Sequence, residues 1–280
     1  MEILKEITKE VFEQNVPAAK MPERNTSVYD RMKLMLQTSY TMMIKTLVSP
    51  ECESALDEDA ELKTLAVRTV CLDAFVRSIR SHDLVLTATG FGIVSTESTA
   101  PASRARVDAL AEEMAVEELL AIDQMLKKLV WLEGWGETEQ ARKRMPTLFY
   151  SPEQFRQLCA MPLTSQNWQS ATGRAASADA FLRGEVSEEY MDELLVKLRT
   201  ATLGNADAII VEKCNRFTAD FISNYELTKG MPNKLLLQSV TEQLESYPES
   251  YPAYTNSRLY ARRHAERYKN RKEDPTFFLI

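Results

Sequence analysis

The sequence predicts an all-α protein, and three observations lead to this prediction. Only 8 of the 280 residues are glycine, whereas the strong helix formers Leu, Ala, Glu, Met, Lys and Arg are plentiful. Apolar residues recur at three- and four-residue steps along most of the chain. Hydrophobic residues make up 44% and charged residues 27%, which is typical of a folded globular chain. We therefore expect a multi-helix bundle.

The periodicity and the capping residues place the individual helices. Ser103 is a candidate N-cap, and Ser151, Pro152 and Gln154 have the spacing of a capping box with proline at the first helical position. The stretch 161–176 is polar and without periodicity, which predicts a surface loop. The expected helices cover residues 2–14, 27–47, 56–81, 103–133, 151–160, 177–202, 205–228 and 232–246.

These helices divide into two halves near the glycines of WLEGWGE. Residues 1–140 form an N-terminal helical bundle with a projecting loop at 84–103, and residues 141–247 form a C-terminal helical part. Residues 248–280 combine repeated Tyr-Pro pairs, a basic stretch and an apolar end, which predicts an extended arm.

The loop at 84–103 is β-prone, unlike its surroundings. Gly90 and Gly92 permit a positive φ, and Ile93 and Val94 favour a short extended piece. A loop of this length in a helical domain is uncommon and tends to be functional. We expect a projecting loop or hairpin in which Phe91, Ile93 and Val94 contact a neighbouring subunit. The alternative is an intramolecular corner packed on its own bundle.

The clearest electrostatic feature is a basic segment, residues 258–272, in a chain of net charge −7. It holds seven Lys and Arg against one Glu, with tyrosines between them. Such a segment suits an acidic protein surface or nucleic acid, and it can also be a solvated helix. The apolar end of the chain suits a clasp on a neighbouring subunit or docking on its own chain. The candidate contact residues here are Arg258, Arg262, Arg263, Arg267, Tyr268, Phe277 and Phe278.

The histidines, the cysteines and the absence of known catalytic motifs argue against an enzyme. The two histidines, His82 and His264, have no partner pattern, and no HExxH, CxxC, P-loop or G-x-S-x-G motif occurs. The four cysteines are scattered, and Cys214 lies on the apolar stripe of its helix. We expect no catalytic residue, cofactor or metal. A site assembled from scattered Glu, Asp and Tyr residues is the alternative.

Two further patterns concern the surface. The glutamates that follow the 84–103 loop are expected to form an outward, solvated acidic face, with contact to a basic partner as the alternative; they are Glu112, Glu113, Glu117 and Glu118. No signal-peptide pattern and no apolar run of membrane-spanning length occurs. These absences predict a soluble intracellular protein without a membrane partner.

Two motifs carry a resemblance to a known family. The first runs from Leu84-Val85-Leu86-Thr87 through Gly90-Phe91-Gly92-Ile93-Val94-Ser95 to Ala100-Pro101-Ala102-Ser103 and Arg106-Val107, and the second from Tyr268-Lys269-Asn270 to Phe277-Phe278. The chain resembles an uncharacterised family encoded by phages and prophages of Bacteroides-type gut bacteria. The resemblance implies a virion structural protein of the head-to-tail connector type, an adaptor or neck-ring component that docks under a portal ring. It implies no catalytic residues.

On this basis we expect a ring component made in the bacterial cytoplasm and located in the virion. Its partners would be other copies of itself and the portal and tail proteins of the particle. The alternative is an intracellular helical nucleic-acid-binding protein that uses residues 258–272.

Overall fold

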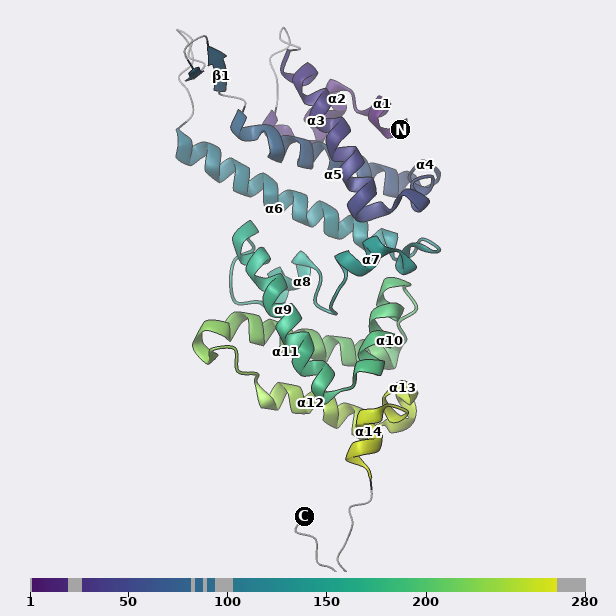
Figure 1. The fold of residues 1–280 in the computed structure, drawn as a ribbon. Helices are drawn as coiled ribbons and strands as arrows, with labels where there is room; N and C mark the ends of the chain where they lie inside the picture. Colours follow the sequence, from purple (N-terminus) through teal and green to yellow (C-terminus); the bar gives the residue numbers. More distant parts are fainter. Residues whose placement is uncertain (1, 20–26, 82–83, 88–89, 94–102, 266–280) are drawn as a thin grey trace, which may run out of the picture.

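The helices form two stacked groups, with helix α6 (Arg104–Leu129) lying across the molecule between them (Figure 1). The computed structural model describes residues 2–19, 27–81, 84–87, 90–93 and 103–265. Over these residues the all-α prediction is confirmed. The described part of the chain contains no helix long and apolar enough to cross a membrane.

The first group comprises α6, α7 and the helices that precede α6. Its longest members are α3, α5 and α6, and α5 packs against both of the others. Asp59 caps α5 by accepting from the backbone N–H groups of Glu61 and Leu62, both at 2.9 Å. The elements of this group are α1 (Glu2–Glu6), α2 (Lys9–Asn15), α3 (Ser27–Met43), the π-helical turn Ile44–Val48, α4 (Ala55–Glu58), α5 (Ala60–Ser78), α6 and α7 (Glu139–Arg144).

The second group packs around α11, which contacts α8, α9 and α12. Ser151 and Gln154 form the expected capping box at the start of α8, with Pro152 at the first helical position. The elements of this group are α8 (Pro152–Leu158), α9 (Ser165–Glu185), α10 (Glu188–Arg199), α11 (Asn205–Thr228), α12 (Lys234–Ser246), α13 (Pro252–Thr255) and α14 (Arg258–Arg263).

Each group has its own apolar core. The first core includes Phe12, Leu72 and Trp135 and extends to Met145. The second core begins with Leu148. The division predicted at residue 140 falls inside α7, which belongs to the first core through Ala141.

The predicted surface loop at 161–176 is wrong, because α9 begins at Ser165. Thr164 caps the helix by accepting from the backbone N–H of Asn167 at 3.1 Å. The buried residues of this helix are Ala171, Ala175, Ala178, Asp179 and Leu182, and the alanines, which come first along the helix, let it pack closely on α11. An alanine stripe carries little hydrophobic signal, so the segment appears polar in the sequence. The helix predicted at 177–202 is also divided, since Ser187 caps α10 separately.

The predicted extended arm is wrong for its first part. Residues 248–263 form short helices, in which Pro248 and Pro252 occupy first-turn positions. Tyr251 and Tyr254 are 2% and 0% exposed and belong to the second core. Each tyrosine ring lies edge-on to another aromatic ring, Tyr251 against Tyr190 at 6.0 Å between centroids. Residues 266–280 lie outside the described residues.

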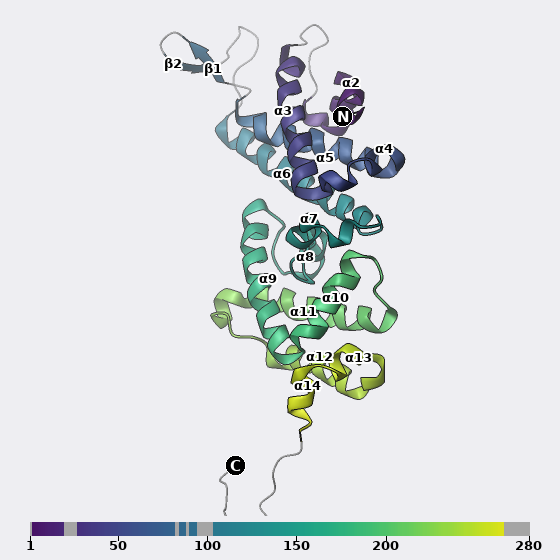
Figure 2. The same ribbon diagram turned by 45° about the vertical axis from the view of Figure 1, so that its right-hand side comes forward.

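The β-prone insert contains an antiparallel pair of strands, β1 (Leu84–Thr87) and β2 (Gly90–Ile93). The register pairs Leu84 with Ile93 and Leu86 with Phe91. Figures 1 and 2 show the two strands standing away from the helices at one end of the molecule. The expected projecting hairpin is present at the level of the backbone.

Two glycines provide a test of the helix packing. An added Cβ at Gly173, in the middle of α9, would meet nothing within 4 Å, whereas one at Gly136 would lie 2.5 Å from the carbonyl oxygen of Arg199. We expect Gly173→Ala to raise the free energy of unfolding by about 0.5–1 kcal/mol, because alanine loses less backbone entropy in a helix. Gly136→Ala should lower it. Urea denaturation of both variants checks this pair, and a stabilising Gly136→Ala would contradict the close approach of η5 (Trp135–Glu137) to α10.

Candidate functional site

The end of the first long helix is capped by side chains from a distant segment. After Met43 the chain continues as a π-helical turn, whose last carbonyl groups lack ordinary helical partners. The Trp135 indole N–H donates to the Leu47 carbonyl at 2.9 Å, and the Gln140 amide donates to the Lys45 carbonyl at 3.1 Å. Three consecutive carbonyls are therefore satisfied from residues 135–144, the third through Arg144.

Arg144 connects this capped helix end to a polar pocket. Its Nε donates to the Thr46 carbonyl and its Nη2 to the Thr46 hydroxyl, each at 2.8 Å. Burial lowers the pKa of Arg144, and the charges of Glu118 and Asp73 oppose that effect. The pocket has a volume of about 330 Å³ and is enclosed by α3, α5, α6 and α7. It is lined by Ser39, Met42, Met43, Thr46, Leu47, Thr69, Val70, Asp73, Arg77, Glu118, Leu119, Ile122 and Arg144.

Two carboxyl groups meet in this pocket. Glu118 on α6 is hydrogen-bonded to Asp73 on α5, and Asp73 also accepts from Arg77 Nε at 2.6 Å. Burial, the nearby charge of Asp73 and the hydrogen bond between the two carboxyl groups together raise the pKa of Glu118 to about 7, against the opposing charges of Arg77 and Arg144. Among the described carboxyl groups, Glu118 has the most strongly raised pKa.

The predicted solvated acidic face is therefore wrong for two of its four glutamates. Glu118 lines the pocket, and Glu112 accepts from the backbone N–H of Ser165 at 2.6 Å. Glu117 pairs with Arg68 on α5 at 2.9 Å with its side chain 42% exposed, and Glu113 is exposed. These contacts join α6 to both helix groups, so that the cluster holds structure together rather than presenting a uniform acidic surface.

One hydroxyl group of the pocket has no protein partner. Ser39 on α3 is 1% exposed, and its Oγ makes no hydrogen bond within the described residues. The neighbouring Thr69 hydroxyl donates to the Leu65 carbonyl at 2.8 Å. A buried hydroxyl without a partner costs free energy, so Ser39 leaves an unused hydrogen-bonding position in the pocket.

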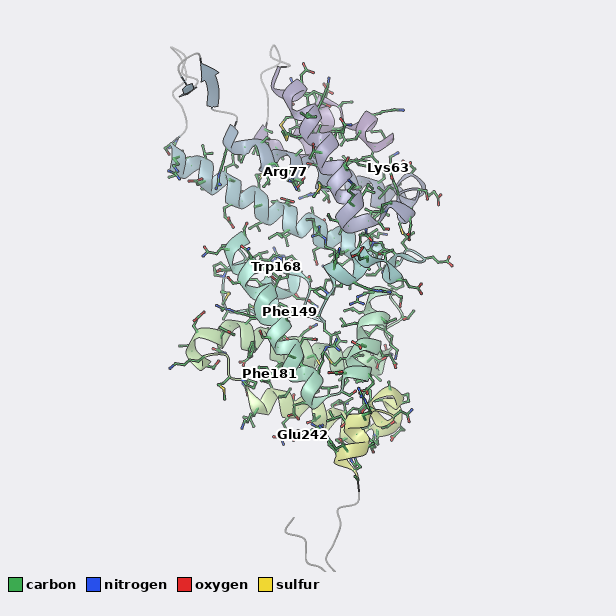
Figure 3. All side chains as sticks on the ribbon, viewed as in Figure 1. Lys63, Arg77, Phe149, Trp168, Phe181 and Glu242 are labelled. Atoms are coloured by element: carbon green, nitrogen blue, oxygen red, sulfur yellow. The ribbon has the colours of Figure 1, made fainter. Side chains whose placement is uncertain are left out.

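A second cavity of about 230 Å³ adjoins the first along α6. The two share Leu119, Ile122 and Arg144 as a common wall. In Figure 3, Arg77 lies above α6, and Phe149 and Trp168 lie below it, on the side of the second helix group. The polar pocket therefore continues into an aromatic cavity at the junction of the two groups.

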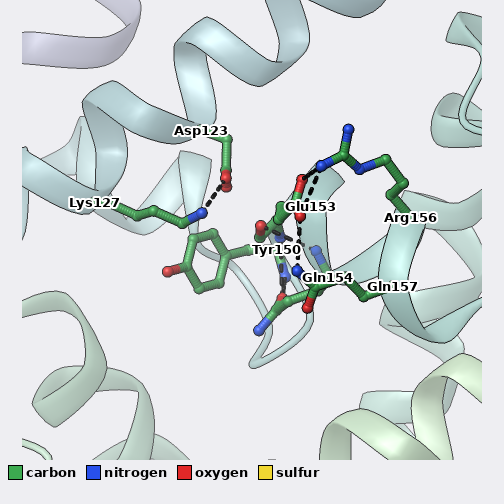
Figure 4. Close-up of polar contacts among 8 residues, drawn as sticks. Asp123, Lys127, Tyr150, Glu153, Gln154, Arg156 and Gln157 are labelled. Carbon is green, nitrogen blue, oxygen red and sulfur yellow. Dashed lines mark hydrogen bonds and ion pairs between the residues drawn. The ribbon is translucent and has the colours of Figure 1, made fainter.

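The junction contains a second buried acid. Asp123 on α6 is 1% exposed and pairs with Lys127 at 2.7 Å through Oδ2, and its Oδ1 has no hydrogen-bond partner among the described residues (Figure 4). Burial, together with the charge of Asp123, raises the pKa of Tyr150 to about 12. Figure 4 also shows Glu153 and Gln154 at the start of α8, which anchors this side of the junction.

The structure separates the sequence-predicted contact residues into two places. Phe91 and Ile93 lie in β2, at the end of the molecule opposite α14 (Figures 1 and 2). Arg258, Arg262 and Arg263 lie in α14. The other candidates lie outside the described residues; they are Val94, Arg267, Tyr268, Phe277 and Phe278.

Two of the three candidate arginines of α14 form ion pairs within the chain. Arg258 pairs with Glu189 at 2.7 Å, and Arg263 donates to the Glu185 carbonyl at 2.7 Å and pairs with its carboxylate. These bonds hold α14 on α9 and α10. Arg262 is exposed and has no ion pair among the described residues.

The cysteine and histidine considered as reactive residues have structural roles. Cys214 is fully buried, as expected, and burial raises its pKa above the usual range. His264 stacks on Tyr260 and lies 3.2 Å from Glu245, and His82 lies outside the described residues. Within the described residues no group of three His, Cys, Asp or Glu could hold a metal ion.

Sequence reasoning missed the pocket residues other than Glu118. Asp73 and Arg77 are spaced as an ordinary i,i+4 ion pair, and Arg144 lies in a run of basic residues. Ser39 carries no signal at all. The four come from three helices far apart in the sequence, so only packing brings them together.

Comparison with known proteins matches the first helix group. A model described as "Family of unknown function (DUF6712)" matches residues 25–144. The matched segment begins just before α3 and ends at the last residue of α7, and it includes both strands and every residue that lines the polar pocket. No curated protein and no solved structure matches the chain.

The carboxyl pair predicts a pH dependence of stability. Because the pKa of Glu118 is raised in the folded state, the folded protein holds this proton more tightly than the unfolded chain. The stabilisation is complete below about pH 4.5, the ordinary glutamate value, and is lost as pH rises to about 7. We expect the free energy of unfolding of the wild type, relative to Glu118→Gln, to fall by about 2–3 kcal/mol between pH 4.5 and 8.

Urea denaturation at pH 4.5, 6, 7 and 8 measures this difference. Glu113→Gln on the same helix is the matched control, since Glu113 is exposed, and its curve should stay parallel to the wild type. Parallel curves for Glu118→Gln and the wild type would show that Glu118 is not held protonated by its surroundings.

Proposed function

We propose that this chain is a structural subunit of a tailed-phage virion, a head-to-tail connector component of the adaptor or neck-ring type. The observation that supports it best is the β1–β2 hairpin, which projects from one end of the helical body (Figures 1 and 2). The motif that carries the resemblance includes both strands of this hairpin, and the resemblance supplies the virion setting. The proposed partners are other copies of the chain and the portal and tail proteins of the particle.

A two-stranded hairpin is marginally stable in water on its own. Among the described residues β1 and β2 pair only with each other, so each strand has an outer edge without a neighbouring strand. Unpaired strand edges are a common site at which a second chain adds a strand. The hairpin therefore suits a contact that is completed in an assembly.

The helices that flank the hairpin in the sequence pack against each other. β1 follows α5 and β2 precedes α6. Arg80 pairs with Asp108 at 3.3 Å, and Arg68 pairs with Glu117 further along α6. These ion pairs join the two helices between which the hairpin is inserted.

The alternating positions of the ladder concentrate apolar residues. Leu84, Leu86, Phe91 and Ile93 occupy one set of alternate positions, whereas the other set contains Val85, Thr87 and two glycines. This pattern suits a ribbon with one face committed to an apolar partner.

At the other end of the molecule, Arg262 is the arginine of α14 that has no ion pair among the described residues.

Replacing Phe91 and Ile93 together by serine tests the proposal. We expect the wild type to form oligomers above 31.9 kDa in light scattering at micromolar concentration, and the double variant to be monomeric. The helical circular dichroism and the free energy of unfolding should change little, by about 0.5 kcal/mol, as is usual for surface positions. Leu227→Ser is the matched control, because Leu227 is 85% exposed on α11 and far along the chain from the hairpin.

Two results would contradict the proposal. Loss of folding in the double variant would assign the hairpin to an intramolecular corner. A wild-type monomer that also fails to bind portal protein would remove the assembly role. Salt-dependent retention on DNA that Arg262→Glu abolishes would instead favour the nucleic-acid-binding alternative.

A further inference from the structure

The polar pocket has the features of a built binding site. Its volume of about 330 Å³ lies at the lower end of the range for small-molecule sites, roughly 300–1,000 Å³. It contains the buried Ser39 hydroxyl, which has no partner among the described residues. A polar ligand atom in the pocket would satisfy that hydroxyl.

The charges of the pocket favour one kind of ligand. Asp73 and Arg77 form an ion pair at 2.6 Å and balance each other. Arg144 donates hydrogen bonds to two uncharged oxygens of Thr46, and these bonds do not neutralise its positive charge. The charge of Arg144 is therefore balanced by Glu118. When Glu118 carries a proton, the pocket has a net charge of +1.

The rest of the lining is apolar. Met43 and Leu47 come from the end of the first long helix, Val70 from α5, and Leu119 and Ile122 from α6. Met43, Leu47 and Val70 are almost fully buried. The pocket thus combines a hydroxyl and two guanidinium groups with an apolar wall.

We propose that this pocket binds a small monocarboxylate with a short apolar stem, whose carboxylate accepts hydrogen bonds from Ser39 and from Arg77 or Arg144. The ligand carboxylate takes the place of the Glu118 charge beside Arg144. Binding is therefore linked to proton uptake by Glu118. The stem lies against the apolar lining, and the volume admits a molecule of the size of hexanoate.

This inference is independent of the assembly role. It concerns the side of α5 and α6 that faces α3 and α7, whereas the assembly contact concerns the hairpin. Failure of one therefore does not bear on the other.

Isothermal titration of the full chain with sodium hexanoate tests the inference. At pH 6 we expect saturable binding, and at pH 8 affinity about tenfold weaker, because Glu118 with a pKa of about 7 is mostly ionised there. Hexanamide, which is neutral, should bind weakly and without pH dependence. Asp73, Arg77 and Arg144 are the charged side chains that share the pocket with Glu118.

Three variants locate the site. Glu118→Gln should bind hexanoate at both pH values with nearly equal affinity, whereas the exposed control Glu113→Gln should behave as the wild type. Ser39→Ala should weaken binding about tenfold, as expected for the loss of a hydrogen bond to a charged group. Arg144→Lys should weaken it at least as much, and Ser39→Ala remains informative if Arg144→Lys fails to fold.

Several outcomes would overturn the inference. They are the absence of binding at millimolar hexanoate at pH 6, binding unchanged in Ser39→Ala, and tighter binding at pH 8. A peptide with a glutamate side chain that binds in place of hexanoate, with the same dependence on Ser39, would assign the pocket to a carboxylate of a partner protein.

Discussion

The arrangement of this chain depends on how the end of its first long helix is capped. The helix passes through a π-helical turn, and the carbonyls of Lys45, Thr46 and Leu47 accept from Gln140, Arg144 and Trp135. Backbone carbonyls at the end of a helix need partners, and here all three partners come from a segment 88–98 residues further along the sequence. The segment that follows α6 is thereby fixed against α3, which closes the first helix group.

The same capping segment, residues 135–144, brings the side chains of the polar pocket together. Arg144 reaches the pocket because its other bonds hold it at Thr46, and it stands opposite Glu118 and Asp73. The carboxyl pair joins α5 to α6, the two helices that flank the hairpin in the sequence. The titration of Glu118 and the stability of this helix pair are consequently linked.

Local signals in the sequence were sufficient to predict a feature where capping and periodicity act within one segment. The capping box of Ser151 and Gln154, the bounds of α11 and the burial of Cys214 all follow from spacing along one helix. They failed for α9, whose first buried residues are alanines, and for the Tyr-Pro segment after α12, whose tyrosines fill a core formed by other helices.

The sequence by itself determined that the protein is helical, where most helices begin and end, and that residues 84–93 are β-prone, because these properties depend on neighbours within a few residues. Only the tertiary structure decided which polar groups meet. Ser39, Asp73, Glu118 and Arg144 share one pocket because three helices and a capping segment pack together, and the burial that results raises the pKa of Glu118. Burial and long-range contact are properties of the packed chain, and no local pattern encodes them.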